Sequence, residues 1–328
     1  MRIGIVGCSI DGGYLGYKLG KMGHDVTIFE QKQAIGGKAC SGLVSERIWN
    51  FFPRNESLVE NRITHVEMHF PRRDIELRFK PDMYALDRNE LDRYAAKLAL
   101  ESGAKIELGA RLARIIQIGG SKPHLVVEKG GQTIVKEVDR VVGCDGSLSK
   151  VREHFTEERP RLRLGIHCFA ARKDYSPTVE VWPTKSGFFW KIPRGERVEY
   201  GIMEDTKAAG KEFKKFLRKQ KVKKPQLHSA LIPEGPVTLN TEYAILCGDA
   251  AGLTKPWSGG GIIWGLNAAQ MFIENGLDAR KYGGAVRSFY APKIFFSKIT
   301  TMAVNLVGRN TPNLLPNNVK FDGDWSIF

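Results

Sequence analysis

Residues 2–30 decide the fold, and they read RIGIVGCSIDGGYLGYKLGKMGHDVTIFE. The apolar run over 2–7 predicts a buried strand, and the glycine-rich stretch after it predicts a tight turn. The spacing of apolar residues over 13–22 predicts a helix, and residues 25–30 predict a second strand. This β-α-β order is the start of a Rossmann-type parallel sheet.

The first turn, Gly7-Cys8-Ser9-Ile10-Asp11-Gly12, suits a phosphate ligand. Glycines here let a pyrophosphate come close to the start of the helix. Glu30 ends the next strand, where a carboxylate can accept hydrogen bonds from ribose hydroxyls. Ser9 stands where the usual pattern has its second glycine, so its side chain either crowds the pyrophosphate or donates a hydrogen bond to it.

Two later segments repeat the strand–turn–helix pattern with a carboxylate in the turn. The first is Val141-Val142-Gly143-Cys144-Asp145-Gly146, which is also compatible with a plain turn. The second, over residues 243–265, reads YAILCGDAAGLTKPWSGGGIIWG and places Asp249 between a buried strand and an expected helix start. Backbone amides at such a helix start stabilise partial negative charge on a ligand.

The rest of the chain suggests a second domain. Expected strands lie over 63–70, 74–80, 105–108, 114–118, 124–128 and 138–143 and within 163–200, expected helices over 91–102, 211–221 and 287–307, and an irregular tail over 311–328. The predicted fold is therefore α/β, with a discontinuous nucleotide-binding domain (1–60, 82–160, 240–285), an antiparallel β substrate domain (61–81, 161–239) and a C-terminal helix and tail (286–328).

Composition narrows the functional classes. The 328 residues include five scattered cysteines, which predict neither a disulfide framework nor a metal site and favour a reducing, cytoplasmic compartment. No signal peptide or membrane-spanning run is expected. The formal net charge of +14 favours anionic partners, or it marks only a solvated basic surface. No nucleic-acid-binding module is recognisable.

The three glycine motifs together resemble the FAD-binding fingerprints of the p-hydroxybenzoate hydroxylase superfamily. Residues 84–92 resemble a further signature of that superfamily, which places Arg88 near the cofactor. The resemblance implies that Gly7, Gly12 and Glu30 hold the ADP half of FAD and that Asp249 binds the ribityl chain. The full set of expected cofactor-binding residues is Gly7, Ser9, Gly12, Glu30, Lys38, Arg88, Asp145, Gly248, Asp249, Pro256, Gly259, Gly260, Gly261 and Ile262.

Within this superfamily, three segments resemble the geranylgeranyl reductase family. Gly252 stands where aromatic hydroxylases usually carry a histidine. Residues 36–45 (GGKACSGLVS) resemble the cysteine-containing stretch of the reductases, and residues 188–193 (FFWKIP) resemble their substrate motif, with Ile192 in place of Phe. The resemblance implies reduction of prenyl C=C bonds, with Cys40 as the catalytic candidate and Phe188, Trp190, Ile192 and Pro193 against the substrate. Cys40 and the strand aromatics are equally compatible with plain packing.

Three alternatives stay open at the level of sequence. Flavin-dependent halogenases carry a Trp-x-Trp-x-Ile-Pro signature that fits Ile192, but no segment clearly supplies their catalytic lysine. A flavin-dependent monooxygenase and a non-catalytic or electron-transfer flavoprotein are the other two. The electron donor is expected to be NAD(P)H or ferredoxin. The basic residues over 211–224 and the apolar residues over 295–306 suggest peripheral contact with an anionic membrane at its inner face.

Overall fold

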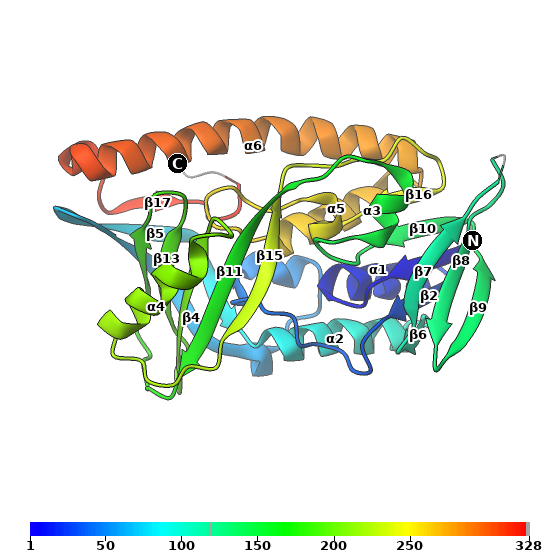
Figure 1. Cartoon of the computed structure of the whole chain (residues 1–328), viewed down its shortest axis with the longest axis horizontal. Helices are drawn as coiled ribbons and strands as arrows, with labels where there is room; N and C mark the ends of the chain where they lie inside the picture. Colours follow the sequence, from blue (N-terminus) through cyan, green and yellow to red (C-terminus); the bar gives the residue numbers. More distant parts are fainter. Residues whose placement is uncertain (119, 326–328) are drawn as a thin grey trace.

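The computed structural model describes residues 1–118 and 120–325 (Figure 1). Its first sheet, sheet A, is parallel throughout, and its strand order is β16-β10-β1-β2-β6. The strands are β1 (Arg2–Val6), β2 (Asp25–Glu30), β6 (Lys105–Leu108), β10 (Arg140–Gly143) and β16 (Ala244–Leu246). The predicted Rossmann-type sheet is confirmed.

Helix α1 (Ile10–Lys21) packs against both α2 (Arg88–Glu101) and α5 (Ile262–Glu274) beside sheet A. Glycines on α1 allow this close packing: a Cβ at Gly13 would lie 2.8 Å from the Ala95 Cβ of α2. A small antiparallel sheet covers the other face of sheet A, and a Cβ at Gly4 would lie 2.6 Å from Leu125 Cδ1 of that sheet. Its strands are β7 (Arg111–Ile116), β8 (His124–Lys129) and β9 (Gln132–Glu137).

The second large sheet, sheet B, forms the other half of the molecule. Its order is β15-β11-β14-β13-β12-β4-β5-β17, with β3 paired to β5. The strands are β3 (Leu43–Ser45), β4 (Val59–Phe70), β5 (Arg73–Leu86), β11 (Arg161–Ala170), β12 (Thr178–Pro183), β13 (Phe188–Pro193), β14 (Val198–Glu204), β15 (His228–Glu234) and β17 (Val319–Phe321).

The prediction of an antiparallel second sheet is wrong in one respect, because sheet B is mixed. The pairs β12–β4 and β17–β5 are parallel. Hairpin turns force only consecutive strands to run antiparallel. Strands that meet from distant parts of the chain can pair in either direction, and both parallel pairs are of this kind.

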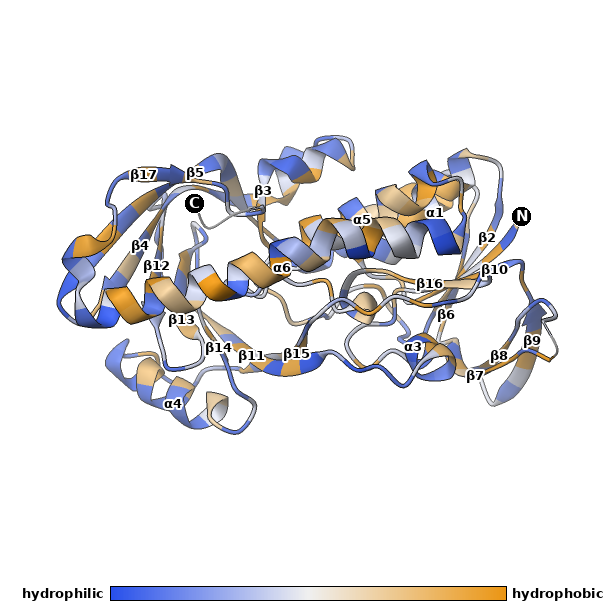
Figure 2. Cartoon of the chain, turned by 90° about the horizontal axis from the view of Figure 1, so that it is seen from above, coloured by the Kyte–Doolittle hydropathy of each residue, from blue (hydrophilic) through white to orange (hydrophobic). Residues whose placement is uncertain are grey.

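The two faces of sheet B carry different helices (Figures 1 and 2). Helix α4 (Ala209–Lys219) packs Phe213, Phe216 and Leu217 on one face, where Phe189 stacks on Phe216 with ring centroids 4.4 Å apart. The long helix α6 (Ala279–Asn310) and the C-terminal tail lie over the other face, where Val304 and Phe321 pack.

The tail is more ordered than predicted. It contains the 3-10 turn η4 (Pro312–Leu314) and the strand β17, which pairs with β5 and packs Phe321 against Phe79. The prediction of an irregular segment over 311–325 is wrong for these two elements, because a three-residue strand is too short to give a periodic signal in the sequence. Residues 326–328 lie outside the described residues.

The remaining elements are α3 (Lys150–Phe155) and the 3-10 turns η1 (Glu46–Asn50), η2 (Glu56–Leu58) and η3 (Gly248–Ala251).

Over residues 1–118 and 120–325, none of the helices combines the length and the apolar character that crossing a membrane requires.

Candidate functional site

Three cavities lie next to one another in the molecule, and neighbouring ones share lining residues. The first, the nucleotide groove, lies at the carboxyl ends of β1, β2 and β10 and is lined by Gly7, Ser9, Glu30, Lys38 and Asp145 among others. Lys38 also lines the second, the central pocket. The central pocket shares Ser41, Leu43, Trp190, Met203, Lys255, Ser258 and Gly260 with the third, the apolar cavity between sheet B and α6.

The nucleotide groove has the backbone shape that a pyrophosphate site needs. Gly7 has a φ of +96°, and a Cβ there would overlap the carbonyl of Cys144. Gly12 lies behind the turn, where a Cβ would overlap the carbonyl of Gly7. Glu30 is held at the end of β2, because its two carboxylate oxygens accept from the amides of Cys8 and Lys32, each at 2.9 Å.

Ser9 and Asp145 line the same groove and differ in what they already bind. The Ser9 hydroxyl makes no capping hydrogen bond to α1 among the described residues, so it is available to a ligand. Asp145 Oδ2 accepts from the amides of Lys150 and Val151, which fixes the start of α3. Burial raises the pKa of Asp145, and Oδ1 is buried with no protein partner among the described residues. Asp145 therefore shapes the turn and also faces the groove.

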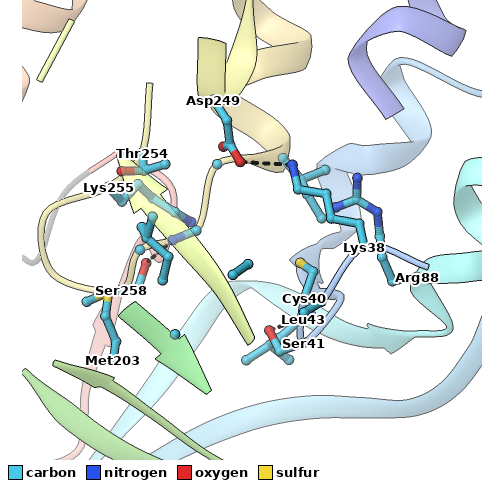
Figure 3. Close-up of a pocket in the computed structure, with 18 of the residues that line it drawn as sticks. Lys38, Cys40, Ser41, Leu43, Arg88, Met203, Asp249, Thr254, Lys255 and Ser258 are labelled. Carbon is cyan, nitrogen blue, oxygen red and sulfur yellow. Dashed lines mark hydrogen bonds and ion pairs between the residues drawn. The ribbon is translucent and has the colours of Figure 1, made fainter. Parts of the chain in front are cut away.

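Lys38 and Asp249 form an ion pair across the central pocket, with Nζ and Oδ2 2.8 Å apart (Figure 3). Burial opposes the charge on Lys38, but the Asp249 carboxylate outweighs it and raises the pKa of Lys38. Asp249 lies in the turn η3, which ends at Gly252 with a φ of +68°. The α-helix begins only at Ile262, so the prediction that Asp249 sits at its N-terminus is wrong.

The glycine run supplies the helix start instead. Gly259, Gly260, Gly261 and Ile262 line the central pocket immediately before α5. A side chain at Gly259, whose φ is +66°, would overlap Met203 Sδ, and a Cβ at Gly261 would lie 3.2 Å from Asp249 Oδ1. Pro256 lies further out, on the wall of the apolar cavity. These glycines leave the backbone as the pocket wall here, with no side chains in front of it.

A second carboxylate, Asp11, lies beside this ion pair, and sequence reasoning missed it. It is 7% exposed, and its Oδ1 has no hydrogen-bond partner among the described residues. Burial raises the pKa of Asp11 to about 7. A Cβ at Gly248 or at Gly265 would overlap this carboxylate, so the two glycines make its room. Gly248 therefore makes space for the Asp11 carboxylate and does not itself line the central pocket.

Arg88 and Cys40 lie beside Lys38, on its side of the central pocket (Figure 3). Arg88 is buried and pairs with Asp92, at 3.0 Å from both Nε and Nη2 to Oδ1. Burial opposes the charge, but Asp92 outweighs it and raises the pKa of Arg88. Cys40 is half-buried, and its Sγ accepts from the amide of Gly42 at 3.5 Å. Cys40 lines the pocket from the glycine-rich loop, and its catalytic role stays a prediction.

Three of the four predicted substrate residues line the apolar cavity. Phe188, Trp190 and Ile192 alternate along β13, so they share the face that looks toward α6 and the tail. Pro193 ends the strand and is buried; its carbonyl accepts from Asn61 Nδ2 at 3.0 Å. The Trp190 indole lies flat against Gly201, where any Cβ would overlap the ring.

A buried polar cluster behind Trp190 was also missed. Trp190 Nε1 donates to Glu199 Oε1 at 3.0 Å, and Arg194 Nη1 donates to Glu199 Oε2 at 2.9 Å. His167 Nδ1 lies 3.3 Å from Glu199 Oε1, and His167 lines the central pocket. Burial opposes the charge on Glu199, but His167 and Arg194 outweigh it and lower the pKa of Glu199. Glu199 thus links the His167 ring, which lines the pocket, to the indole of Trp190.

The C-terminal tail is held against the pocket wall by a third group of residues that the sequence did not predict. We call this group the tail latch; it consists of Ser45, Arg47, Lys255 and Asp324. Lys255 Nζ donates to the carbonyl of Gly323 at 2.8 Å and lies 3.2 Å from Asp324 Oδ1. Asp324 is fully buried and also binds Arg47 at 2.9 Å and the Ser45 hydroxyl. Lys255 forms part of the wall of both the central pocket and the apolar cavity.

No family model matches the chain. Curated relatives do, at modest identity over most of its length. The chain is 26% identical over 306 residues to digeranylgeranylglycerophospholipid reductase 2 of Methanothermobacter thermautotrophicus, covering 85% of this chain and 78% of the relative. It is 24% identical to the chloroplastic geranylgeranyl diphosphate reductase of Nicotiana tabacum, covering 86% and 67%. The resemblance predicted from the sequence is confirmed.

Solved structures share the fold. A geranylgeranyl bacteriochlorophyll reductase-like protein from Thermoplasma acidophilum superimposes with a TM-score of 0.81 at 20% identity, covering 92% of this chain and 86% of its own. A flavin-dependent halogenase superimposes with a TM-score of 0.73 at 16% identity, covering 90% and 62%. At these identities the likeness is evidence for the architecture alone.

Proposed function

We propose that this protein is an FAD-dependent oxidoreductase that reduces C=C bonds of a prenyl lipid. The observation that carries the proposal is the shared wall between the central pocket and the apolar cavity. Trp190 and Met203 belong to both, so a ring in the pocket and an isoprenoid chain in the cavity would be in contact. Relatives named geranylgeranyl reductases support the same reaction class.

The residues present fit FAD. The groove offers a turn with room for a pyrophosphate at Gly7 and a fixed ribose-binding carboxylate at Glu30. The central pocket has a glycine-lined helix start and the Lys38–Asp249 pair at the position expected for the ribityl chain. Arg88 completes the polar wall. When bound, the flavin supplies hydride to one alkene carbon.

The protein then has to place the alkene and deliver a proton to its other carbon. Phe188, Trp190 and Ile192 would hold the chain by apolar contact. Cys40 and His167 both line the central pocket, so each can hold the proton next to the shared wall. His167 has the stronger support, because its Nδ1 lies 3.3 Å from the buried carboxylate of Glu199.

The decisive experiment is anaerobic single-turnover oxidation. Protein loaded with FAD and reduced by dithionite is mixed with geranylgeranyl diphosphate or a geranylgeranylated glycerophospholipid. We expect the oxidised flavin absorption to return, with a product heavier by two hydrogens per bond reduced. Flavin that stays reduced with both substrates contradicts the reductase proposal. Protein that cannot be loaded with FAD contradicts the cofactor proposal.

A halogenase activity has one observation in its favour. Lys255 provides a buried ammonium between the two cavities, whereas the sequence offered no clear lysine. Its Nζ is held by Gly323 and Asp324, however, and an aromatic substrate would not need so long an apolar wall. Oxygen, chloride and an aromatic acceptor added to the reduced protein test this alternative; chlorinated product would establish it.

The electron donor is part of the same proposal. Within residues 1–118 and 120–325, the groove at Gly7 is the turn with the shape of a nucleotide site, and FAD would occupy it. We therefore favour a protein donor of the ferredoxin class over NAD(P)H. Anaerobic flavin reduction by reduced ferredoxin, and none by NADPH, is the expected result; rapid reduction by NADPH would reverse the assignment.

A further inference from the structure

Helix α6 exposes an apolar stripe that is unusual for a surface helix. Five large apolar residues, Phe295, Phe296, Ile299, Met302 and Leu306, are each between 50% and 72% exposed; we call them the α6 stripe. Residues 295, 299, 302 and 306 follow helical spacing along one side. Figure 2 looks onto this helix and shows apolar bands along its C-terminal half. A contiguous patch of this kind marks an interaction site.

All the charged residues of the same helix are basic. The segment from Ala279 to Asn310 contains no acidic residue. Its basic residues are Arg280, Lys281, Arg287, Lys293, Lys298 and Arg309. The groups that hold three of them are uncharged: Arg287 donates to the Thr238 hydroxyl, Lys293 lies over the Phe289 ring and Arg309 donates to the carbonyl of Thr184. Their charge remains available to an anionic partner.

The opposite side of this stretch faces the apolar cavity. Thr301, Val304 and Asn305 line it, within the same turns that expose Ile299, Met302 and Leu306. One helix segment thus separates the cavity from the exposed stripe. A lipid that lies against the stripe would be a helix width, about 10 Å, from the cavity wall.

The basic helix α4 does not belong to this surface. It packs on the other face of sheet B from α6, as Figure 1 shows. Its aromatic residues Phe213 and Phe216 are buried against that face. The sequence suggested that residues 211–224 and 295–306 act together on a membrane, but the structure separates them. Of these two segments, the one on α6 combines exposed apolar side chains with cations.

We propose that the α6 stripe docks the protein on an anionic lipid surface and places the apolar cavity next to the bilayer. A second copy of the chain is a poorer occupant, because α6 carries basic residues and no acidic ones, so a symmetric pairing across the stripe would set like charges against each other. An anionic bilayer satisfies both the stripe and the cations. The inference rests on the proposed function only for the identity of the lipid that enters the cavity.

Vesicle co-sedimentation of the full chain tests the proposal at 0.15 M salt. Vesicles of phosphatidylcholine with 30% phosphatidylglycerol should bind the protein at least tenfold better than pure phosphatidylcholine. The triple variant Phe295→Ser, Phe296→Ser, Met302→Ser should lose at least tenfold on the anionic vesicles. The matched triple variant Lys214→Ser, Lys215→Ser, Lys219→Ser on α4 should lose less than twofold. Circular dichroism and melting curves confirm that both variants are folded.

Two kinds of result overturn the proposal. One concerns vesicle binding: the unmodified protein does not bind anionic vesicles, or the stripe variant binds them equally well. The other is a stripe variant that turns a dimer into a monomer in light scattering with no effect on vesicle binding, which makes the stripe an interface between copies. Single-turnover oxidation with detergent-dispersed geranylgeranyl diphosphate should be unchanged in the stripe variant. A docking failure and a failure of the reductase proposal are therefore separate readouts.

Discussion

Asp11 gives the sharpest test of the physical reasoning about this site. Its carboxyl is buried, Oδ1 has no partner among the described residues, and burial raises its pKa to about 7. Because the folded protein holds this proton up to a higher pH than the unfolded chain does, the free energy of unfolding falls as pH rises from about 4 to about 7. A difference of roughly 3 pKa units corresponds to about 4 kcal/mol, fully lost above pH 7.

The variant Asp11→Asn keeps the size of the side chain and removes the charge. We expect it to match the unmodified protein at pH 5 and to exceed it at pH 8 by about 2 to 4 kcal/mol, because the amide needs no deprotonation. Urea unfolding of flavin-free protein at pH 5, 6, 7 and 8, followed by circular dichroism, measures both.

A second buried carboxylate provides the matched control. Asp92 is 2% exposed and neutralises Arg88, so Asp92→Asn leaves a buried cation unpaired. This variant should be destabilised by about 3 kcal/mol at pH 8, opposite in sign to Asp11→Asn. If Asp11→Asn is no more stable than the unmodified protein at pH 8, or keeps its pH dependence, then Asp11 is ionised and paired, and the account of the pocket is wrong.

Three further outcomes follow from the site. Asp249→Ala removes the partner of Lys38 and should lower the FAD content of purified protein; a full complement of FAD would rule out its role. Val304→Trp fills the apolar cavity and should slow flavin oxidation by geranylgeranyl diphosphate at least tenfold with the flavin spectrum unchanged, whereas Ala303→Trp, exposed on the same helix, should not. Asp324→Asn leaves Lys255 buried without its carboxylate partner and should lower the free energy of unfolding, measured with urea, by about 3 kcal/mol. A decrease of less than about 1 kcal/mol would show that the tail latch does not stabilise the fold.

The parallel sheet and the glycine turns could be predicted because their signals are local. Strand, turn and helix follow one another within residues 2–30, and glycines mark the turn directly. Period-two alternation likewise places Phe188, Trp190 and Ile192 on one face of a strand, whatever that strand packs against. The sequence therefore located the groove, the loop with Cys40 and one wall of the apolar cavity.

The missed groups depend on contacts between distant segments. Lys255 and Asp324 meet because the tail returns to sheet B. No local sequence pattern predicts this pairing. His167 and Glu199 lie on neighbouring strands whose pairing sequence alone does not provide. Asp11 had an indirect signal, since Gly248 and Gly265 are needed only where another group occupies the space of their side chains.

The distribution of charge along the cavities argues for two ligands and not one. The nucleotide groove is lined by seven charged residues: Glu30, Lys32, Lys38, Asp92, Arg111, Asp145 and Lys150. In the central pocket Lys38 pairs with Asp249, and burial raises the pKa of Asp11, whose Oδ1 has no hydrogen-bond partner among the described residues, to about 7. The charged residues among those lining the apolar cavity are Arg163 and Lys255, each with a carboxylate partner. A dinucleotide with charge at one end and a neutral ring at the other matches the first two cavities. Such a dinucleotide would not fill the apolar cavity, which adjoins the central pocket where the ring would lie. A separate apolar substrate is the simplest explanation for the apolar residues that line this cavity.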